Sequence, residues 1–330
     1  MAQSSTPIFS TASVIGSGLM GTGIAAVFAA AKMKVTLIDT DQRRLEESKS
    51  RIQAIAAELL SAELIEENPE TVAARVVCAP DLAACKGSEL ILEAIFENLE
   101  AKHGLYTQLE QIVSPSTIIG SNTSGLLPSE LCRPFRHPER FLVVHFWNPP
   151  HAIPLVEVVP NPATRPEITD QVLKFLRSIN TDPVLVAKEI PGFIGNRLQY
   201  AVLREALAIV RSGAATPEAV DTAMKASLGP RYSVVGPIET ADLGGLDTFF
   251  TIASYLMPLL AKDEDVLQLM KEKVAAGKTG PRSGEGFYPW PEERAADVIA
   301  HRNHALLQHR KAVSSVGARR GTLGHTPAPW

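Results

Sequence analysis

Residues 12–21 read Ala12-Ser-Val-Ile-Gly-Ser-Gly-Leu-Met-Gly21, a short apolar run that leads directly into a glycine-rich turn. An alanine-rich run over 24–31 follows, and Val35-Thr-Leu-Ile-Asp39 is typical of a second strand that ends in an acid. Strand, glycine turn, helix, strand and terminal acid together form one βαβ unit. This unit predicts a dinucleotide site. The alternative is an ordinary glycine turn between packed elements.

Each part of the unit has a physical reason. Gly16 permits the tight turn, Gly18 lets the backbone approach a pyrophosphate, and Gly21 lets the helix pack closely on the strand. The helix N-terminus offers free N–H groups and a partial positive charge to the phosphates. Asp39 can accept hydrogen bonds from both hydroxyls of an adenosine ribose, and its charge would repel a 2′-phosphate. The pattern therefore favours NAD over NADP.

The composition limits the class of protein. The chain has 330 residues, enough for two domains, and 45% of them are hydrophobic and 21% charged. A net charge of −4 does not favour nucleic acid, and no apolar run approaches the roughly 20 residues of a membrane helix. The N-terminus does not resemble a secretory signal, so we expect a cytoplasmic protein. Three cysteines without metal-ligand spacing predict idle thiols and no metal site: Cys78, Cys85 and Cys132.

Strand and helix candidates alternate through the first part of the chain. Apolar residues at helical spacing predict helices over 41–64, 99–113 and 168–180, with strands over 89–95 and 116–121 between them. Such alternation is typical of a parallel sheet with helices on its faces. The fold class expected is therefore α/β, with a Rossmann-type doubly wound, mostly parallel sheet.

The pattern changes in two places. Strands over 140–146 and 153–159 are joined by a connection too short for a crossover helix, so we expect them to be antiparallel neighbours. After a last strand over 182–187, only helices are predicted. We expect a dinucleotide-binding domain over 1–188 and an all-helical C-terminal domain over 189–330. A Gly/Pro-rich composition predicts a loose tail from about residue 311.

A histidine and a glutamate are the strongest candidates for chemistry. His145 ends one antiparallel strand and Glu157 lies in the next, so a turn near His151 makes them cross-strand neighbours. A carboxylate there would fix the imidazole tautomer and stabilise the imidazolium, which makes His145 a general acid/base. A lone strand histidine is more often structural. A buried glutamate, however, is costly unless it is paired.

Two polar residues are weaker candidates. Ser124 follows the carboxyl end of a predicted strand, where ligands bind in open α/β sheets, although it is equally well placed to cap a short helix. Asn196 stands near the start of a long predicted helix, where it could hold a substrate oxygen that develops negative charge or act as a simple cap.

Together these residues resemble the L-3-hydroxyacyl-CoA dehydrogenase superfamily. The resemblance covers residues from about 13 to 290. Its motifs, in chain order, are Gly16-Ser-Gly-Leu-Met-Gly21, Glu93-Ala-Ile-Phe-Glu97, Ser121-Asn-Thr-Ser124, His145-Phe-Trp-Asn-Pro149, Leu155-Val-Glu157, Pro191-Gly-Phe-Ile-Gly-Asn-Arg197, Gly236-Pro237, Gly245-Leu-Asp247 and Gly284-Glu-Gly-Phe-Tyr288.

The resemblance implies roles for individual residues. His145 would take the hydroxyl proton as hydride leaves the 3-carbon for NAD, Glu157 would orient it, and Ser124 and Asn196 would polarise the substrate oxygen. It also implies that the helical domain forms a homodimer and closes over a small-molecule substrate. The residues implied around NAD are Gly16, Ser17, Gly18, Leu19, Met20, Gly21, Asp39, Glu97, Lys102 and Asn148.

One departure concerns the substrate. In acyl-CoA members the helix after the second strand carries serine and lysine residues that contact CoA, whereas Ile55 and Ala62 hold those places here and Glu58 adds negative charge. No lysine or arginine lies between Arg51 and Arg75, so a CoA phosphate would find little attraction there.

A second departure points to another branch. Stretches 196–200, 228–232 and 236–240 are similar to lambda-crystallin, the L-gulonate 3-dehydrogenase branch, in which Arg231 could bind a substrate carboxylate. Residues 245–247 and 283–288 instead resemble the acyl-CoA branch. The expected substrate is therefore a 3-hydroxyacyl-CoA such as 3-hydroxybutyryl-CoA, and a free 3-hydroxy acid such as L-gulonate is the alternative. The role of Arg282 also remains open. Two alternatives without catalysis are a crystallin-like structural protein and a redox-sensing NAD-binding protein.

Overall fold

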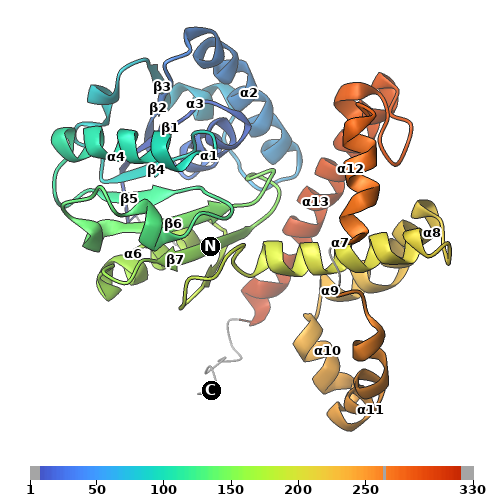
Figure 1. Ribbon diagram of the computed structural model, residues 1–330. Coiled ribbons are helices and arrows are strands. Elements are labelled where there is room, and N and C mark those ends of the chain that lie inside the picture. Colours follow the sequence, from blue (N-terminus) through green and yellow to red (C-terminus); the bar gives the residue numbers. More distant parts are fainter. Residues whose placement is uncertain (1–7, 263–264, 321–330) are drawn as a thin grey trace. The chain divides into compact units, whose positions relative to one another are not determined.

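The computed structural model describes residues 8–262 and 265–320. Two compact units share the chain. One contains the residues up to Ile194 together with those from Ile299 onward, and the other is Gly195–Val298. Each unit has its own set of elements, coloured by position along the chain in Figure 1.

The first unit is built on an eight-stranded sheet with the strand order β3-β2-β1-β4-β5-β6-β7-β8. Neighbouring strands from β3 through to β6 are parallel, β7 is antiparallel to β6, and β8 is parallel to β7. The strands are β1 Thr11–Ile15, β2 Lys34–Ile38, β3 Val76–Ala79, β4 Leu90–Glu93, β5 Ile118–Ser121, β6 Phe141–Phe146, β7 Leu155–Pro160 and β8 Asp182–Leu185.

Helices cover both faces of this sheet, as Figure 1 shows. Alternate residues of one strand enter different cores. Val14 packs with Phe28 and Phe175, whereas its neighbour Ile15 belongs to the core around Tyr106. Because both faces of the sheet are buried, most strands consist largely of consecutive apolar residues. The predicted doubly wound sheet is confirmed. Its helices are α1 Leu19–Ala30, α2 Gln42–Ser61, α3 Pro69–Ala74, α4 Leu99–Ile112, α5 Pro128–Leu131 and α6 Pro166–Ser178.

The antiparallel pair β6–β7 has the register that the sequence predicted. His145 is directly opposite Glu157, and Val144 is opposite Val158. The connection over 147–154 turns the chain back within a few residues, which leaves no room for a crossover helix. This reversal places the two polar side chains of an otherwise apolar strand pair side by side.

The second unit is helical, apart from isolated β-bridges at Gly280–Glu285 and Glu285–Pro289. An all-helical C-terminal region was predicted, although the helices Gly229–Tyr232, Pro237–Gly244 and Glu292–Arg320 were not predicted individually. A π-helical turn, Met224–Leu228, joins α8 to α9. The helices are α7 Gly195–Arg211, α8 Pro217–Ala223, α9 Gly229–Tyr232, α10 Pro237–Gly244, α11 Leu246–Leu256, α12 Gln268–Ala275 and the first residues of α13 Glu292–Arg320.

The prediction of a loose tail from about residue 311 was wrong for its first ten residues, because α13 continues to Arg320. From Ile299 onward α13 belongs to the first unit, where Leu307 is buried against Leu59, Ala62 and Ala152. Tertiary packing of this kind stabilises a helix, and the local sequence does not reveal it. The rest of the predicted tail, 321–330, lies outside the described residues. Among the described helices none is long and apolar enough to cross a membrane.

Candidate functional site

The glycine turn between β1 and α1 requires glycine at two positions. Gly16 has φ +100°, and a Cβ there would lie 2.6 Å from the carbonyl oxygen of Ala94 after β4. At Gly21 a Cβ would lie 1.8 Å from the carbonyl oxygen of Gly16. The turn therefore fits closely between β4 and the first turn of α1, and the roles predicted for these two glycines are confirmed.

The space in front of α1 is open. No atom lies within 4 Å of a Cβ built at Gly18, the residue before the helix, and no side chain caps the helix there. Leu19 is exposed, whereas Ser17 is buried behind the turn and Met20 is half-buried. An uncapped helix N-terminus that faces open space suits the pyrophosphate of a dinucleotide. The residues present therefore fit the predicted cofactor.

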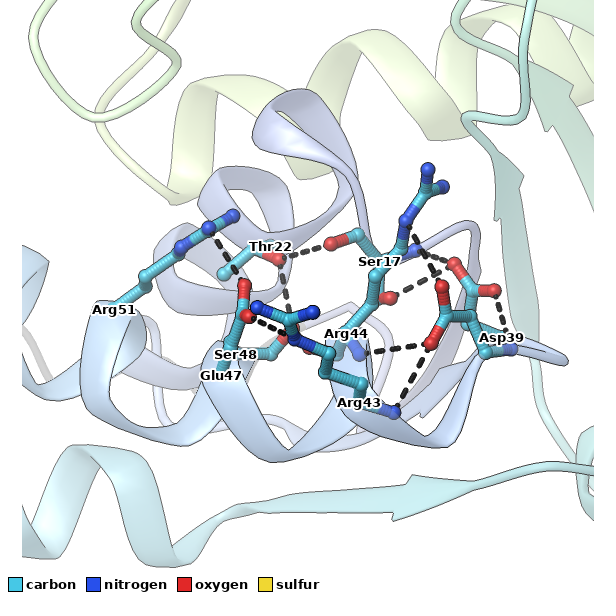
Figure 2. Close-up of polar contacts among 9 residues, drawn as sticks. Ser17, Thr22, Asp39, Arg43, Arg44, Glu47, Ser48 and Arg51 are labelled. Carbon is cyan, nitrogen blue, oxygen red and sulfur yellow. Dashed lines mark hydrogen bonds and ion pairs between the residues drawn. The ribbon is translucent and has the colours of Figure 1, made fainter.

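Asp39, just after the end of β2, is held by the glycine turn. Its Oδ2 accepts hydrogen bonds from the backbone N of Ser17 at 2.7 Å and from Ser17 Oγ at 2.8 Å (Figure 2). Its Oδ1 accepts a hydrogen bond from Asp41 N at 3.0 Å. Partial burial raises the pKa of Asp39, but these hydrogen bonds outweigh it and the net pKa lies below the ordinary value. Asp39 is therefore ionised and oriented at the edge where a ribose is predicted.

A second buried acid lies at the end of β4. Glu93 is fully buried and accepts hydrogen bonds from Lys102 Nζ, Tyr106 Oη and Ser121 Oγ, each at 2.6 Å, and from Ile95 N at 2.8 Å. Burial, followed by the charge of Glu93, raises the pKa of Tyr106 well above its ordinary value. The sequence showed Glu93 within a buried strand, yet its hydrogen-bonding role was not predicted. An acid in an apolar run was the available signal.

Lys102 and Glu97 are linked to this acid. Lys102 is only 1% exposed, and its Nζ also lies 3.4 Å from Glu97 Oε2. Glu97 is partly exposed and accepts from the Thr123 hydroxyl and from Ser124 N at 3.1 Å. The ammonium of Lys102 is thus held inside the unit by two carboxylates, and its contact with NAD stays a prediction.

In the loop after β5, the hydroxyl group that accepts a hydrogen bond from the following backbone belongs to a different residue than expected. Thr123, rather than Ser124, supplies the hydroxyl that accepts from Leu126 N, at 3.0 Å. Ser124 is exposed at the carboxyl end of the sheet. Asn122, which the sequence did not single out, accepts from Phe146 N at 2.7 Å through its Oδ1. Asn122 therefore ties the end of β5 to the end of β6, next to His145.

His145 and Glu157 form the predicted pair. His145 Nδ1 lies 2.9 Å from Glu157 Oε2, and both side chains are buried. Glu157 also accepts from Trp147 Nε1 at 3.1 Å and from Ile194 N at 2.8 Å. A carboxylate with several donors is stable when buried. The arrangement gives an imidazole of defined orientation that can exchange a proton through Nε2.

The remaining predicted residues fall into two groups. In the first unit, Asn148 is exposed and forms a cis peptide bond with Pro149. Asn196, Arg231 and Arg282 belong to the second unit, so their distance from His145 stays a prediction. No cluster of ligands suited to a metal ion is present in the part of the chain that the structure describes. Burial raises the pKa of the Cys85 thiol to about 11, which makes it unreactive at neutral pH.

The first unit thus gathers one set of residues at one edge of its sheet. The carboxyl ends of β1, β2, β4, β5 and β6 lie side by side because these strands are parallel. Near these ends stand the glycine turn, Asp39, Glu97, Ser124 and His145. Open α/β sheets bind ligands at this edge, and the His145–Glu157 pair and the glycine turn lie at it within one unit.

Comparison with known proteins agrees with this geometry. Residues 11–190 match the family model described as 3-hydroxyacyl-CoA dehydrogenase, NAD binding domain, and residues 192–290 match 3-hydroxyacyl-CoA dehydrogenase, C-terminal domain. The first match contains the glycine turn and Asp39. NAD is therefore the cofactor of this chain.

Three relatives illustrate the range of the similarity. A probable 3-hydroxybutyryl-CoA dehydrogenase of Deinococcus radiodurans is 37% identical over 84% of this chain and 99% of its own length. A lambda-crystallin homolog of Rattus norvegicus is 37% identical over 70% of this chain and 73% of its own length. The 5-formyl-3-hydroxy-2-methylpyridine 4-carboxylate 5-dehydrogenase of Mesorhizobium japonicum is 33% identical over 90% of this chain and 96% of its own length.

A crystal structure of a dehydrogenase that acts on the same pyridine carboxylic acid, described as an NAD+-dependent dismutase, is similar to this chain with a TM-score of 0.87. It is 31% identical and covers 93% of this chain and 99% of its own. The two family matches and these identities lead to one conclusion. The chain belongs to the 3-hydroxyacyl-CoA dehydrogenase family, a family of NAD-dependent oxidoreductases.

Proposed function

We propose that the protein catalyses the reversible, NAD-dependent oxidation of a hydroxyl-bearing carbon to a carbonyl, with His145 as the acid/base. The observation that carries the proposal is the 2.9 Å contact between His145 Nδ1 and Glu157 Oε2. It lies at the carboxyl end of β6, on the sheet edge that carries the glycine turn. A structural role alone would not require a paired histidine and glutamate inside an otherwise apolar strand pair.

In this mechanism Glu157 fixes the tautomer of His145. Because the carboxylate accepts from Nδ1, the proton of neutral His145 is on Nδ1, and Nε2 is free to take the hydroxyl proton. Glu157 then balances the charge of the imidazolium. Bound NAD would supply the acceptor for the hydride that leaves the carbon bearing the hydroxyl group. Ser124 and Asn196 are proposed to hold the substrate oxygen, and such donors contribute most when charge develops on it.

The NAD contacts are assigned to residues of the first unit. The turn Gly16, Ser17, Gly18 and the first helical residues Leu19, Met20 and Gly21 would hold the pyrophosphate. Asp39 would accept hydrogen bonds from the hydroxyl groups of the adenosine ribose. Its negative charge would repel a 2′-phosphate. Glu97, Lys102 and Asn148 complete the proposed set.

The substrate we favour is a small free acid rather than a CoA thioester. In the acyl-CoA members the C-terminal half of α2 is expected to contact CoA, and one face of this half packs against α13 in this chain. Leu59 and Ala62 are buried against Leu307, and Lys311 Nζ lies 2.9 Å from Glu63 Oε2. Helix α13 begins at Glu292, beyond both family matches. The similarity to the pyridine carboxylic acid dehydrogenases over nearly their whole length supports the same choice.

A CoA thioester such as 3-hydroxybutyryl-CoA is the second candidate. It is favoured by the description of both matching family models and by the relative from Deinococcus radiodurans. Under this alternative the acyl-CoA would have to reach His145 without contacting the covered face of α2.

A side-by-side assay distinguishes the candidates. NADH oxidation with acetoacetyl-CoA is compared with NAD reduction by L-gulonate, by free 3-hydroxybutyrate and by a hydroxymethyl- or formyl-pyridine carboxylate. We expect kcat/KM to be at least tenfold higher for a free acid. A higher value for acetoacetyl-CoA would reverse the assignment, and no turnover with any of these compounds would favour a crystallin-like or NAD-sensing protein.

We also propose that the protein forms a homodimer through its helical unit. Large apolar side chains on α10 and α11 are unusually exposed: Ile238 and Leu243 each 74%, and Phe250 75%. Large apolar side chains that are exposed in one chain are often buried in protein–protein interfaces. Sedimentation velocity should give twice the chain mass, and Phe250→Glu should shift the protein toward monomer. A monomeric wild type would contradict this part of the proposal.

A further inference from the structure

We infer that Trp147 is a positioning residue that sets the pH at which His145 exchanges its proton. This inference rests on the proposed role of His145 and goes beyond it. It comes from the contacts of Glu157, which accepts from Trp147 and Ile194 as well as from His145.

Two donors share one carboxylate oxygen. His145 Nδ1 lies 2.9 Å from Glu157 Oε2, and Trp147 Nε1 donates to the same atom at 3.1 Å. Glu157 is fully buried, so its charge is balanced by these donors rather than by water. The indole N–H stabilises the carboxylate charge, and the carboxylate therefore attracts the imidazolium less strongly than it would without the indole. Removing this donor should favour the protonated form of His145.

Two aromatic rings flank the imidazole. The ring centroids of Trp147 and Phe193 lie 5.7 Å and 5.9 Å from that of His145, with interplanar angles of 53° and 54°. Phe193 is fully buried and has φ 48°, a left-handed conformation that a bulky residue adopts only when its surroundings impose it. The next residue, Ile194, donates its N–H to Glu157 Oε1 at 2.8 Å. The carboxylate is thus held at both oxygens.

Other titratable groups lie on the segments that adjoin β6, β7 and β8. The same β6–β7 connection carries His151, whose Nε2 lies 3.0 Å from Glu58 Oε2. The segment after β8 carries Lys188 and also Glu189, whose carboxylate accepts from Ser129 N at 2.9 Å. His151 lies on the same connection as Trp147, so the variant His151→Gln is included to separate its titration from that of His145.

The first test is the pH profile of kcat/KM for hydroxyl oxidation in Trp147→Phe. Phenylalanine keeps an aromatic ring next to His145 and removes the indole N–H together with part of the ring volume. A role in packing alone predicts a loss of stability with an unchanged pH profile. We expect the acidic limb to move to higher pH by about one unit, the shift that ~1.4 kcal/mol between the two protonation states produces. Trp290→Phe, in the second unit, is the matched control and should keep the wild-type midpoint. A limb that stays within about 0.2 unit of wild type would overturn the inference.

The second test uses the folded wild type and does not depend on the variant's stability. The chain has three tryptophans, so protein labelled with ¹⁵N-tryptophan should give three indole N–H resonances. Trp290→Phe and Trp330→Phe identify two of them and leave Trp147 as the third. We expect the Trp147 resonance to titrate with the midpoint of the acidic limb, also in His151→Gln, and to lose this titration in His145→Gln. A Trp147 resonance that does not respond at this midpoint would refute the inference.

The two proposals fail separately. If His145→Gln abolishes turnover while Trp147→Phe leaves the pH profile unchanged, the proposed function stands and the role of Trp147 is wrong. If His145→Gln retains activity, the proposed function itself is wrong.

Discussion

His145 Nδ1 and Glu157 Oε2 lie 2.9 Å apart across the one antiparallel strand pair of the sheet, where β7 reverses the direction of β6. This pair leads to the most direct prediction. His145→Gln should lower kcat by about 10² to 10⁴, the usual contribution of a general acid/base. The Kd for NAD, measured by fluorescence titration, should stay within about twofold of wild type, since the proposed NAD contacts do not include the imidazole.

A matched control for this prediction is His137→Gln, since His137 is half-buried and contacts Glu139 rather than Glu157. It should keep wild-type kcat. Activity of His145→Gln within threefold of wild type would contradict the role assigned to His145.

The cofactor site gives a second prediction. Asp39→Ala removes the acceptor for the adenosine ribose and the charge that opposes a 2′-phosphate. The Kd for NAD should rise about tenfold, and the ratio of the Kd for NADP to the Kd for NAD should decrease. Glu46→Ala, an exposed change on α2, is the control. An unchanged Kd for NAD in Asp39→Ala would refute the ribose contact.

The buried ion pair at the end of β4 predicts a loss of stability. Glu93→Gln leaves the ammonium of Lys102 with only the partly exposed Glu97, at 3.4 Å. Removing one partner of a buried pair typically costs about 3–5 kcal/mol. Urea denaturation followed by circular dichroism should show a decrease of this order.

The exposed Glu100→Gln on α4 serves as the control and should change the free energy of unfolding by less than about 0.5 kcal/mol. Equal stability of Glu93→Gln and wild type would mean that Lys102 is neutral or has another partner.

The buried side chain of His151 should make the free energy of unfolding depend on pH. Burial lowers the pKa of His151 below its ordinary value of 6.5, despite the nearby Glu58. The unfolded chain therefore takes up a proton near pH 6.5, whereas the folded chain does so only at lower pH. Stability from this group is complete above pH 6.5 and falls as the pH decreases through and below that value, by at most ~1.4 kcal/mol per unit.

His151→Gln should remove this part of the pH dependence, because glutamine does not titrate and its amide can still donate to Glu58. Thermal unfolding midpoints at pH 7.5 and 5.5 measure the effect. His301→Gln, exposed on α13, should behave as wild type. An identical decrease in Tm for wild type and His151→Gln would show that His151 does not contribute.

Local patterns predicted most of the fold because they depend on neighbours in the chain. The βαβ unit follows from glycine spacing and apolar periodicity. The His145–Glu157 register follows from two strands joined by a connection too short for a crossover. Each of these signals is contained within about 30 residues.

Contacts that no strand register or helical repeat specifies were not predicted. Lys102 and Tyr106 on α4 and Ser121 on β5 all donate to Glu93, and Arg310 Nη2 donates to the carbonyl of Asn180 across 130 residues. The helix α13 was missed for the same reason. Its residues from 311 onward were assigned to a loose tail, whereas Leu307 and Arg310, just before them, pack on the first unit.

The sequence by itself thus determined the doubly wound sheet, the NAD turn and the pairing of His145 with Glu157, because periodicity and spacing encode them locally. Only the tertiary structure decided that Trp147 and Ile194 also hold Glu157, that Lys102 is buried between two carboxylates, and that α13 covers α2. These relationships depend on which side chains the folded backbone brings together, and no spacing along the chain specifies them.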